Sequence, residues 1–473
     1  MRLPVPTPLV AVEAAGSLRR GAGRVVLASP GEPPLLGPGG EGVEVSAEVT
    51  GAAGTTHRQD GRWVLGTGEG TPADWRTAGA SLVRALDADV ERGGGLTFDV
   101  QLTANADVRA FVLGLALGGY RFKVTGEQPP RRVKSLRLVG PDVSPDDVRH
   151  ALDLASATSL ARDLANAPSN VKDPAWLAGA AVKAASGVPG LDVVVRDEKW
   201  LADAGFGGVV AVGGGSSRPP RLVHLTWRGP ADAPHLVLVG KGITFDTGGI
   251  SVKPADGMHL MRTDMAGGAA VIGAVIAIAR LGLPVRVTGL VPCAENHVSG
   301  SAYRPGDVVR HYGGTTTEVT NTDAEGRMVL ADALAYAVHE LEPDALVDVA
   351  TLTGAMKVTL GTRIGGLFAN DDETAARIVE AGERTGEAWW RMPLLEDLAD
   401  AVKSDVADLR QIPPGPGGIT AALFLREFTG GLPWAHLDIA GPARADRDYA
   451  EVVAGASGFA ARTLVEFAEH YRR

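Results

Sequence analysis

Short apolar runs alternate with segments of helical periodicity over the larger, C-terminal part of the chain. Helices are expected over 266–281 and 328–341, between apolar runs of strand length. These strand-like runs are Val193–Val195, Val209–Val212, Leu236–Val239, Val285–Val291 and Ala345–Ala350. Continuous apolar strands that alternate with helices are typical of a mainly parallel sheet flanked by helices. The expected fold class is therefore α/β, with a mainly parallel mixed sheet flanked by helices in the larger, C-terminal domain.

The first 125 residues or so are rich in Gly, Pro and Ala and show a weaker pattern. Arg24–Ala28 and Val43–Val49 are predicted strands, and the second alternates apolar and polar residues. Residues 77–86 and 108–117 are predicted helices. This part is expected to be a smaller N-terminal α/β domain.

A strong helix start separates the two parts. Ser144 can cap the helix, Pro145 suits its first turn, and Asp146 and Asp147 favour its positive end. The helix is expected to end near Leu164. The predicted organisation is an N-terminal domain over 1–140, a connecting helix over 141–165 and a larger C-terminal domain over 166–473.

Composition narrows the class of protein. The 473 residues are 45% hydrophobic and 22% charged, which is typical of a soluble globular chain. The net charge of −10 disfavours binding to the negatively charged backbone of nucleic acid. Cys293 is the sole cysteine, so no intrachain disulfide can form, and it is expected to be a small buried apolar residue. These features fit a cytoplasmic protein.

Neither a secretory signal nor a membrane span is predicted. Three prolines interrupt the first eight residues before any apolar run develops. The small and apolar run 266–279 is shorter than the about 20 residues that a membrane span needs. We expect it to be a buried helix.

Acids and lysines gather where the predicted strands end. Lys241 follows the strand that starts at Leu236, and Asp246, Lys253 and Asp264 come after it in order. The segment 321–327 (NTDAEGR) lies between an extended segment and the next helix. In such sheets ligands bind outside the carboxyl ends of the strands.

Converging carboxylates need compensating charge. Asp323 and Glu325 are two residues apart, so an extended segment points both to the same side. Together with Asp246 and Asp264 they would repel one another in one pocket and raise each other's pKa. Two divalent cations would balance the four charges, and Zn²⁺, Mn²⁺ or Mg²⁺ suit oxygen ligands. We therefore expect a site for two metal ions.

Each fragment alone also has an ordinary structural explanation. Residues 246–249 can form a simple turn, and the acids of 323–326 can start a helix. The segment 213–217 (GGGSS) lacks the lysine of a phosphate-binding loop, which favours a plain loop.

Taken together, the segments resemble the leucyl aminopeptidase, or cytosol aminopeptidase, family over about residues 160 to 473. The segment Asn321–Arg327 is similar to the family's characteristic signature. Further similar segments are 239–249, 253–254, 261–265, 350–355 and 434–441. The first 150 residues resemble the family only in size and α/β character.

The resemblance implies a metal role for five residues. Asp246 and Glu325 would bridge two metal ions, Lys241 and Asp264 would complete one metal site, and Asp323 would complete the other. To bind a metal, Lys241 must be neutral, and a neighbouring dication would lower its pKa.

The resemblance also implies catalytic and substrate-binding residues. Lys253, if charged, would stabilise the developing oxyanion, and Arg327 would hold a bicarbonate ion as general base. The substrate would be positioned by Thr351, the carbonyl of Leu352 and Gly354. Its side chain would enter a pocket lined by Met261, Asn321, Ala440 and Ala443.

The expected function is a metal-dependent aminopeptidase that removes N-terminal leucine and other apolar residues by a metal-activated water. Mn²⁺ or Zn²⁺ are the expected ions, and the resemblance further implies a homohexamer of dihedral symmetry. Two alternatives remain: a two-metal phosphoesterase, and a non-catalytic, DNA-binding architectural role. The acidic net charge disfavours the second, and a basic patch at 130–134 keeps it open.

Overall fold

A computed structural model describes residues 5–126 and 129–471. The first four residues of the proline-rich N-terminal segment lie outside the described residues. The chain forms two compact units, one running to Ser159 with residues 445–454, and the other holding 160–444 and the residues after 454. The boundary falls inside α3 (Pro145–Asn166). The domain limits expected from the sequence stay a prediction.

The start of α3 confirms the predicted cap. The Ser144 hydroxyl oxygen accepts the backbone N–H groups of Asp146 and Asp147 at 3.1 and 3.3 Å. The helix ends at Asn166, close to the expected Leu164.

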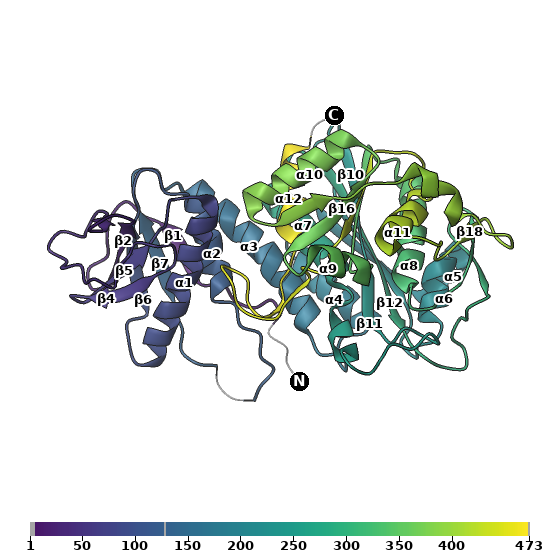
Figure 1. Cartoon of the computed structure of the whole chain (residues 1–473), viewed down its shortest axis with the longest axis horizontal. Coiled ribbons are helices and arrows are strands. Elements are labelled where there is room, and N and C mark those ends of the chain that lie inside the picture. Colours follow the sequence, from purple (N-terminus) through teal and green to yellow (C-terminus); the bar gives the residue numbers. More distant parts are fainter. Residues whose placement is uncertain (1–4, 127–128, 472–473) are drawn as a thin grey trace. The chain divides into compact units, whose positions relative to one another are not determined.

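The first unit is built on a sheet whose strands follow the order β1-β7-β6-β2-β5-β4. The helices α1 (Pro72–Glu91) and α2 (Val108–Gly118) pack against each other beside it (Figure 1). The strands are β1 (Ala11–Ala14), β2 (Gly23–Ser29), β3 (Leu35–Leu36), β4 (Thr56–Gln59), β5 (Arg62–Gly66), β6 (Thr97–Gln101) and β7 (Ser135–Val139). Both predicted helices and the strand at Arg24–Ala28 are confirmed.

The strand predicted at Val43–Val49 is wrong. This segment forms turns, in which Val43 and Val49 are buried against Ala28 and Val64. The apolar positions of this segment therefore reflect the burial of Val43 and Val49 on the sheet of the first unit. The backbone of the segment does not pair with a neighbouring strand.

The second unit contains a larger mixed sheet with the order β17-β16-β19-β15-β10-β12-β9-β8, and β11 pairs with β12. The central pairs β10–β12, β10–β15 and β15–β19 are parallel, as expected. The strands are β8 (Leu191–Arg196), β9 (Arg221–Trp227), β10 (His235–Gly240), β11 (Gly242–Asp246), β12 (Arg286–Asn296), β15 (Ala345–Ala350), β16 (Ile364–Ala369), β17 (Ala388–Arg391) and β19 (Trp434–Asp438). This sheet confirms the expected fold class.

Helices cover both faces of this sheet (Figure 1). Val237 and Val239 of β10 share a buried cluster with side chains of α6 (Gly207–Gly213), α8 (Glu325–Tyr336) and α11 (Gly417–Arg426). The alternate side chains of β10 point the other way. On that face α7 (Ala266–Leu281) packs on β10, β12 and β15.

The remaining helices and strands of the described residues are α4 (Pro174–Ala185), α5 (Glu198–Ala204), α9 (Gly354–Leu360), α10 (Asp372–Thr385), α12 (Ala461–His470), the 3-10 helices at Met258–Thr263 and Glu396–Val402, a π-helical turn at Ala337–Leu341, and the strands β13 (Val308–Arg310), β14 (Thr316–Glu318), β18 (Leu409–Arg410), β20 (Arg444–Ala445) and β21 (Gly455–Ala456).

The strand predicted at Val209–Val212 is also wrong, because these residues belong to α6. Val209 and Val212 are buried in the cluster beneath α8, and the Val209 N–H donates to Asp332 Oδ2 of α8 at 2.8 Å. A four-residue apolar run fits a buried helix as well as a strand, and here the contact with α8 decides.

The apolar run 266–279 is a buried helix, as expected. Joined with the preceding 3-10 turn, Met258–Leu281 has the length and composition of a membrane span, and 83% of its most apolar window is buried inside the structure. Such burial is typical of a core helix.

Candidate active site

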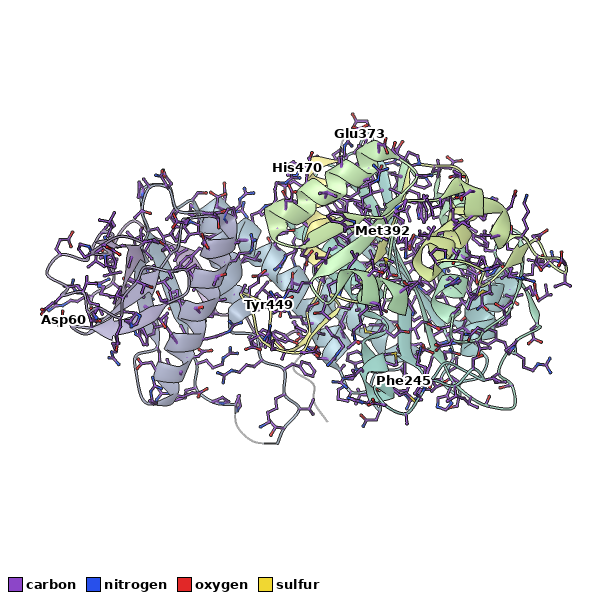
Figure 2. All side chains as sticks on the ribbon, viewed as in Figure 1. Asp60, Phe245, Glu373, Met392, Tyr449 and His470 are labelled. Atoms are coloured by element: carbon purple, nitrogen blue, oxygen red, sulfur yellow. The ribbon has the colours of Figure 1, made fainter. Side chains whose placement is uncertain are left out.

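The ends of neighbouring strands bring the predicted site residues together. Lys241 follows β10, Asp246 ends β11, and Thr351 follows β15. Because β10, β11 and β15 are parallel to β12 or to one another, their carboxyl ends meet at one edge of the sheet. Phe245, labelled in Figure 2, precedes Asp246 and marks this edge.

Lys241 lies at the centre of one half of the site. Its Nζ is 2.9 Å from Asp264 Oδ1 and 2.7 Å from Glu325 Oε1, and it donates to the Thr351 carbonyl at 3.0 Å. The side chains of Lys241, Asp264 and Glu325 are all buried. The Thr351 hydroxyl donates to Asp264 Oδ1 at 2.7 Å.

Lys253 joins the other half of the site. Its Nζ is 2.7 Å from Asp246 Oδ2 and forms a second ion pair with Asp323. Asp246 is buried, whereas the Asp323 side chain is 33% exposed. The site therefore has a buried half and a half that solvent or a ligand can reach.

Three carboxylates converge closely enough to share a cation. Oxygen atoms of Asp246, Asp323 and Glu325 lie within 4.8 Å of one another, and Asp264 is linked to Glu325 through Lys241. Burial raises the pKa of Asp246 and that of Asp264, and the lysines oppose this shift. The positive charges of two lysines balance the negative charges of four carboxylates only in part. Additional positive charge, such as that of a metal ion, would therefore stabilise the site.

The lysines are held in the charged state by these acids. Burial alone would lower the pKa of Lys241, but Asp264 and Glu325 raise it well above its ordinary value. Asp246 and Glu325 likewise overcome burial at Lys253 and raise its pKa. The neutral Lys241 expected from the sequence therefore requires a cation that displaces its proton.

Arg327 is buried in the first turn of α8, and one of its guanidinium N–H groups faces no acceptor among the described residues. It donates from Nη1 to the Gln411 carbonyl at 2.7 Å, whereas its Nε has no hydrogen-bond partner among the described residues. Burial lowers its pKa to about 10, so the guanidinium remains charged at neutral pH. A buried cation with an unused donor is suited to bind an anion.

Gln411 organises the signature segment. Its Oε1 accepts the N–H groups of Thr320 and Asn321 at 2.9 and 3.0 Å, and its Nε2 donates to the Ala324 carbonyl at 3.1 Å. Gln411 is fully buried. It lies 84 residues after Arg327 in the chain, and no motif around it predicts this role.

Asp438, at the end of β19, fixes the backbone of the predicted substrate-binding segments. Its carboxylate accepts the N–H groups of Leu352 at 3.2 Å, Thr353 at 3.0 Å and Ala440 at 3.0 Å. With its N–H engaged, Leu352 keeps a fixed orientation at the end of β15. Sequence patterns did not single out Asp438.

The remaining predicted substrate residues occupy the surrounding turns. Met261 lies in the 3-10 helix and its carbonyl accepts the Asp264 N–H at 3.1 Å. The Asn321 Oδ1 accepts the Asp323 N–H at 2.8 Å, Gly354 is the exposed first residue of α9, and Ala443 is buried. Their role in binding a substrate side chain stays a prediction.

Comparison with known proteins gives consistent results. Residues 159–465 match the model of the cytosol aminopeptidase family, catalytic domain. A probable cytosol aminopeptidase of Chlorobium limicola is 42% identical over an alignment of 429 positions, and the match covers 85% of this chain and 85% of the relative. One from Streptomyces coelicolor is 45% identical over 425 residues, covering 84% of this chain and 80% of the relative.

A solved structure shares the fold over nearly the full length. The bottromycin maturation enzyme BotP in complex with Mn matches with a TM-score of 0.84 and 40% sequence identity, covering 95% of this chain and 99% of BotP. The similarity therefore includes the first unit, for which the sequence pattern alone was weak.

Proposed function

Because the chain belongs to the cytosol aminopeptidase family of metallo-exopeptidases, we propose that it hydrolyses the N-terminal residue from peptides at the cluster of Lys241, Asp246, Asp264, Asp323 and Glu325. Leucine and other apolar residues are the proposed preference. The observation that carries this proposal is the convergence of three carboxylates within 4.8 Å beside a fourth, buried one.

The donor set fits divalent metal ions. Carboxylate oxygens suit Mn²⁺ and Zn²⁺, and a lysine amine can bind once its proton is displaced. In the proposed arrangement Asp246 and Glu325 would be shared by two ions, Lys241 and Asp264 would complete one site, and Asp323 would complete the other. The Mn in the BotP structure supports this choice of metal. Paired ions at such a site polarise a carbonyl group and lower the pKa of water.

Two cationic side chains have distinct proposed roles. Lys253 is held charged and its side chain is 20% exposed, so its ammonium can approach a substrate oxygen as negative charge develops. Arg327 is proposed to hold bicarbonate, which would accept a proton from the attacking water. The buried Nε without a partner among the described residues supports an anion at this place.

The substrate is proposed to lie against Thr351, Leu352 and Gly354. The Leu352 carbonyl can accept a donor from the peptide because Asp438 already engages the Leu352 N–H. The side chain of the first residue is proposed to enter a pocket formed by Met261, Asn321, Ala440 and Ala443.

Assembly and location extend the proposal. We propose that the protein acts in the cytoplasm, supported by the similarity to proteins named cytosol aminopeptidases. We also propose a homohexamer, which the resemblance of the sequence to the family implies. A light-scattering mass equal to one chain would contradict the hexamer. The net charge of −10 supports a protein that does not bind nucleic acid, and a gel shift with duplex DNA tests that point.

The decisive experiment compares substrates and variants in parallel. Purified protein loaded with Mn²⁺ or Zn²⁺ should release leucine from leucine anilide and leave a phosphate monoester intact. Asp323→Asn should abolish this activity, whereas Asp203→Asn, a matched exposed acid paired with Lys199, should leave it unchanged. Activity that survives both Asp323→Asn and exhaustive chelation would disprove the metal assignment.

A further inference from the structure

Asn296, the last residue of β12, joins two segments that carry proposed metal ligands. Its Nδ2 donates to Asp246 Oδ1 at 2.8 Å and to the Thr322 carbonyl at 2.9 Å. Only 1% of Asn296 is exposed. One amide group therefore spans from the end of β11 to the residue that precedes Asp323.

Thr322 is itself fixed by a dense set of hydrogen bonds. Its hydroxyl donates to the Gly248 carbonyl at 2.6 Å and accepts the Ser251 N–H at 2.8 Å. The Tyr303 hydroxyl donates to the same Thr322 carbonyl at 2.9 Å. The Thr322 carbonyl, held in place by these bonds, therefore fixes one N–H of the Asn296 amide. The second N–H of that amide is directed at Asp246.

Asp246 is oriented by this contact. Its Oδ1 accepts both the Asn296 amide and the Gly248 N–H, each at 2.8 Å, while its Oδ2 faces Lys253. Two donors on one oxygen hold the carboxylate plane, so that Oδ2 is presented toward Lys253, which also pairs with Asp323.

The Asn296 side chain is closely packed against the backbone of Gly249. Gly249 has φ +65°, and a Cβ added there would lie 2.8 Å from Asn296 Oδ1. An amide also supplies a donor without adding charge, whereas an aspartate would add a fifth carboxylate beside Asp246.

We propose that Asn296 is a positioning residue that holds Asp246 in register with Asp323 and Glu325 and thereby raises the affinity of the cluster for divalent metal ions. This inference rests on the proposed function. Hydrogen-bonding partners of metal ligands typically change metal affinity about 10- to 100-fold.

The test measures metal binding separately from activity. Chelator-stripped wild type, Asn296→Ala and Asn296→Leu are titrated with Mn²⁺ by calorimetry, with thermal unfolding of each metal-free protein as a check on folding. We expect about a 10- to 100-fold weaker Mn²⁺ affinity in both variants. At saturating Mn²⁺, kcat should fall while KM for leucine anilide stays near the wild-type value.

Asn370→Ala is the matched control. Asn370 is likewise an amide with two partners, the Leu432 carbonyl at 2.9 Å and the Trp434 N–H at 2.8 Å, but it has no hydrogen bond to any of the proposed ligands. Its Mn²⁺ affinity should equal that of the wild type. If Asn296→Ala does not fold, Asn296→Leu carries the test, because leucine keeps most of the side chain's volume and supplies no donor.

The outcomes separate the two proposals. A wild type that binds Mn²⁺ and releases leucine, with unchanged Mn²⁺ affinity in the Asn296 variants, overturns the role of Asn296 alone. A wild type that neither binds Mn²⁺ nor releases leucine overturns the proposed function, and the inference with it.

Discussion

Lys241 Nζ and Asp264 Oδ1 lie 2.9 Å apart, and both side chains are buried. Lys241 follows β10, whereas Asp264 directly precedes Met265 and α7, so the ion pair joins a strand end to the start of a helix. A buried pair of this kind is costly to break from one side, because the remaining charge has no partner.

Replacement of Lys241 tests both its structural and its proposed metal-binding roles. Lys241→Met keeps the length of the side chain but leaves Asp264 and Glu325 without a cation. We expect the metal-free protein to lose about 3–5 kcal/mol of unfolding free energy, as measured by urea denaturation. Activity on leucine anilide should be absent, and calorimetry should detect one strongly bound Mn²⁺, whereas two are expected for the wild type. Two ions bound with wild-type affinity would argue against Lys241 as a ligand.

Arg327 should make the reaction sensitive to bicarbonate. In bicarbonate-free buffer, added bicarbonate should increase kcat of the wild type. Arg327→Gln should remove this response and lower kcat about 100-fold, the lower range for loss of a general base. Stopped-time assays under nitrogen measure both effects. An equal bicarbonate response in wild type and variant would remove the anion from the proposal.

Gln411 should affect both stability and activity, because it holds the segment that carries Asp323 and Glu325. Gln411→Ala leaves the Thr320 and Asn321 N–H groups and the Ala324 carbonyl without this partner. We expect a loss of about 2–4 kcal/mol of unfolding free energy, at about 1 kcal/mol or more for each bond. Gln411→Glu keeps the acceptor and should retain more stability. Unfolding midpoints in urea at one pH distinguish the two variants.

The pair of His436 and Asp348 should make stability depend on pH. His436 Nδ1 lies 2.5 Å from Asp348 Oδ1, and both residues are buried. Burial lowers the pKa of His436, but Asp348, with a smaller contribution from Asp438, produces a net increase, and Arg327 opposes it.

A raised pKa in the folded state gives stability that is fully present below the unfolded pKa of about 6.5. That contribution is lost as pH rises through the folded pKa. Relative to His436→Gln, the wild type should therefore be most stabilised near pH 6 and less so as pH increases above about 6.5. Urea denaturation of both proteins across this range checks the sign, and a difference that grows with pH would contradict it.

The sheet architecture was predictable because the central strands are long and apolar. β10 and β15 are buried on both faces, so their sequences carry little besides Val, Leu and Ala. The errors at Val43–Val49 and Val209–Val212 involve short runs. In each, burial is real, but packing against distant segments decides whether the backbone forms a turn or a helix.

For the candidate site, local motifs identified the charged residues but not their supports. Asp323 and Glu325 belong to one recognisable segment, whereas Asn296 and Gln411 reach that segment from other parts of the chain. Each is a single polar residue in otherwise ordinary surroundings. Their function depends on distances in space that a one-dimensional pattern does not contain.

The apolar helix α7 has a consequence for biosynthesis. One of its flanks is covered by α12, which begins at Ala461 near the C-terminus. The ribosome must therefore synthesise about 180 further residues after α7 before that cover exists. During this interval the nascent chain would expose an apolar surface to which chaperones can bind. A premature stop codon ahead of Ala461 would leave that apolar surface exposed and prone to aggregation.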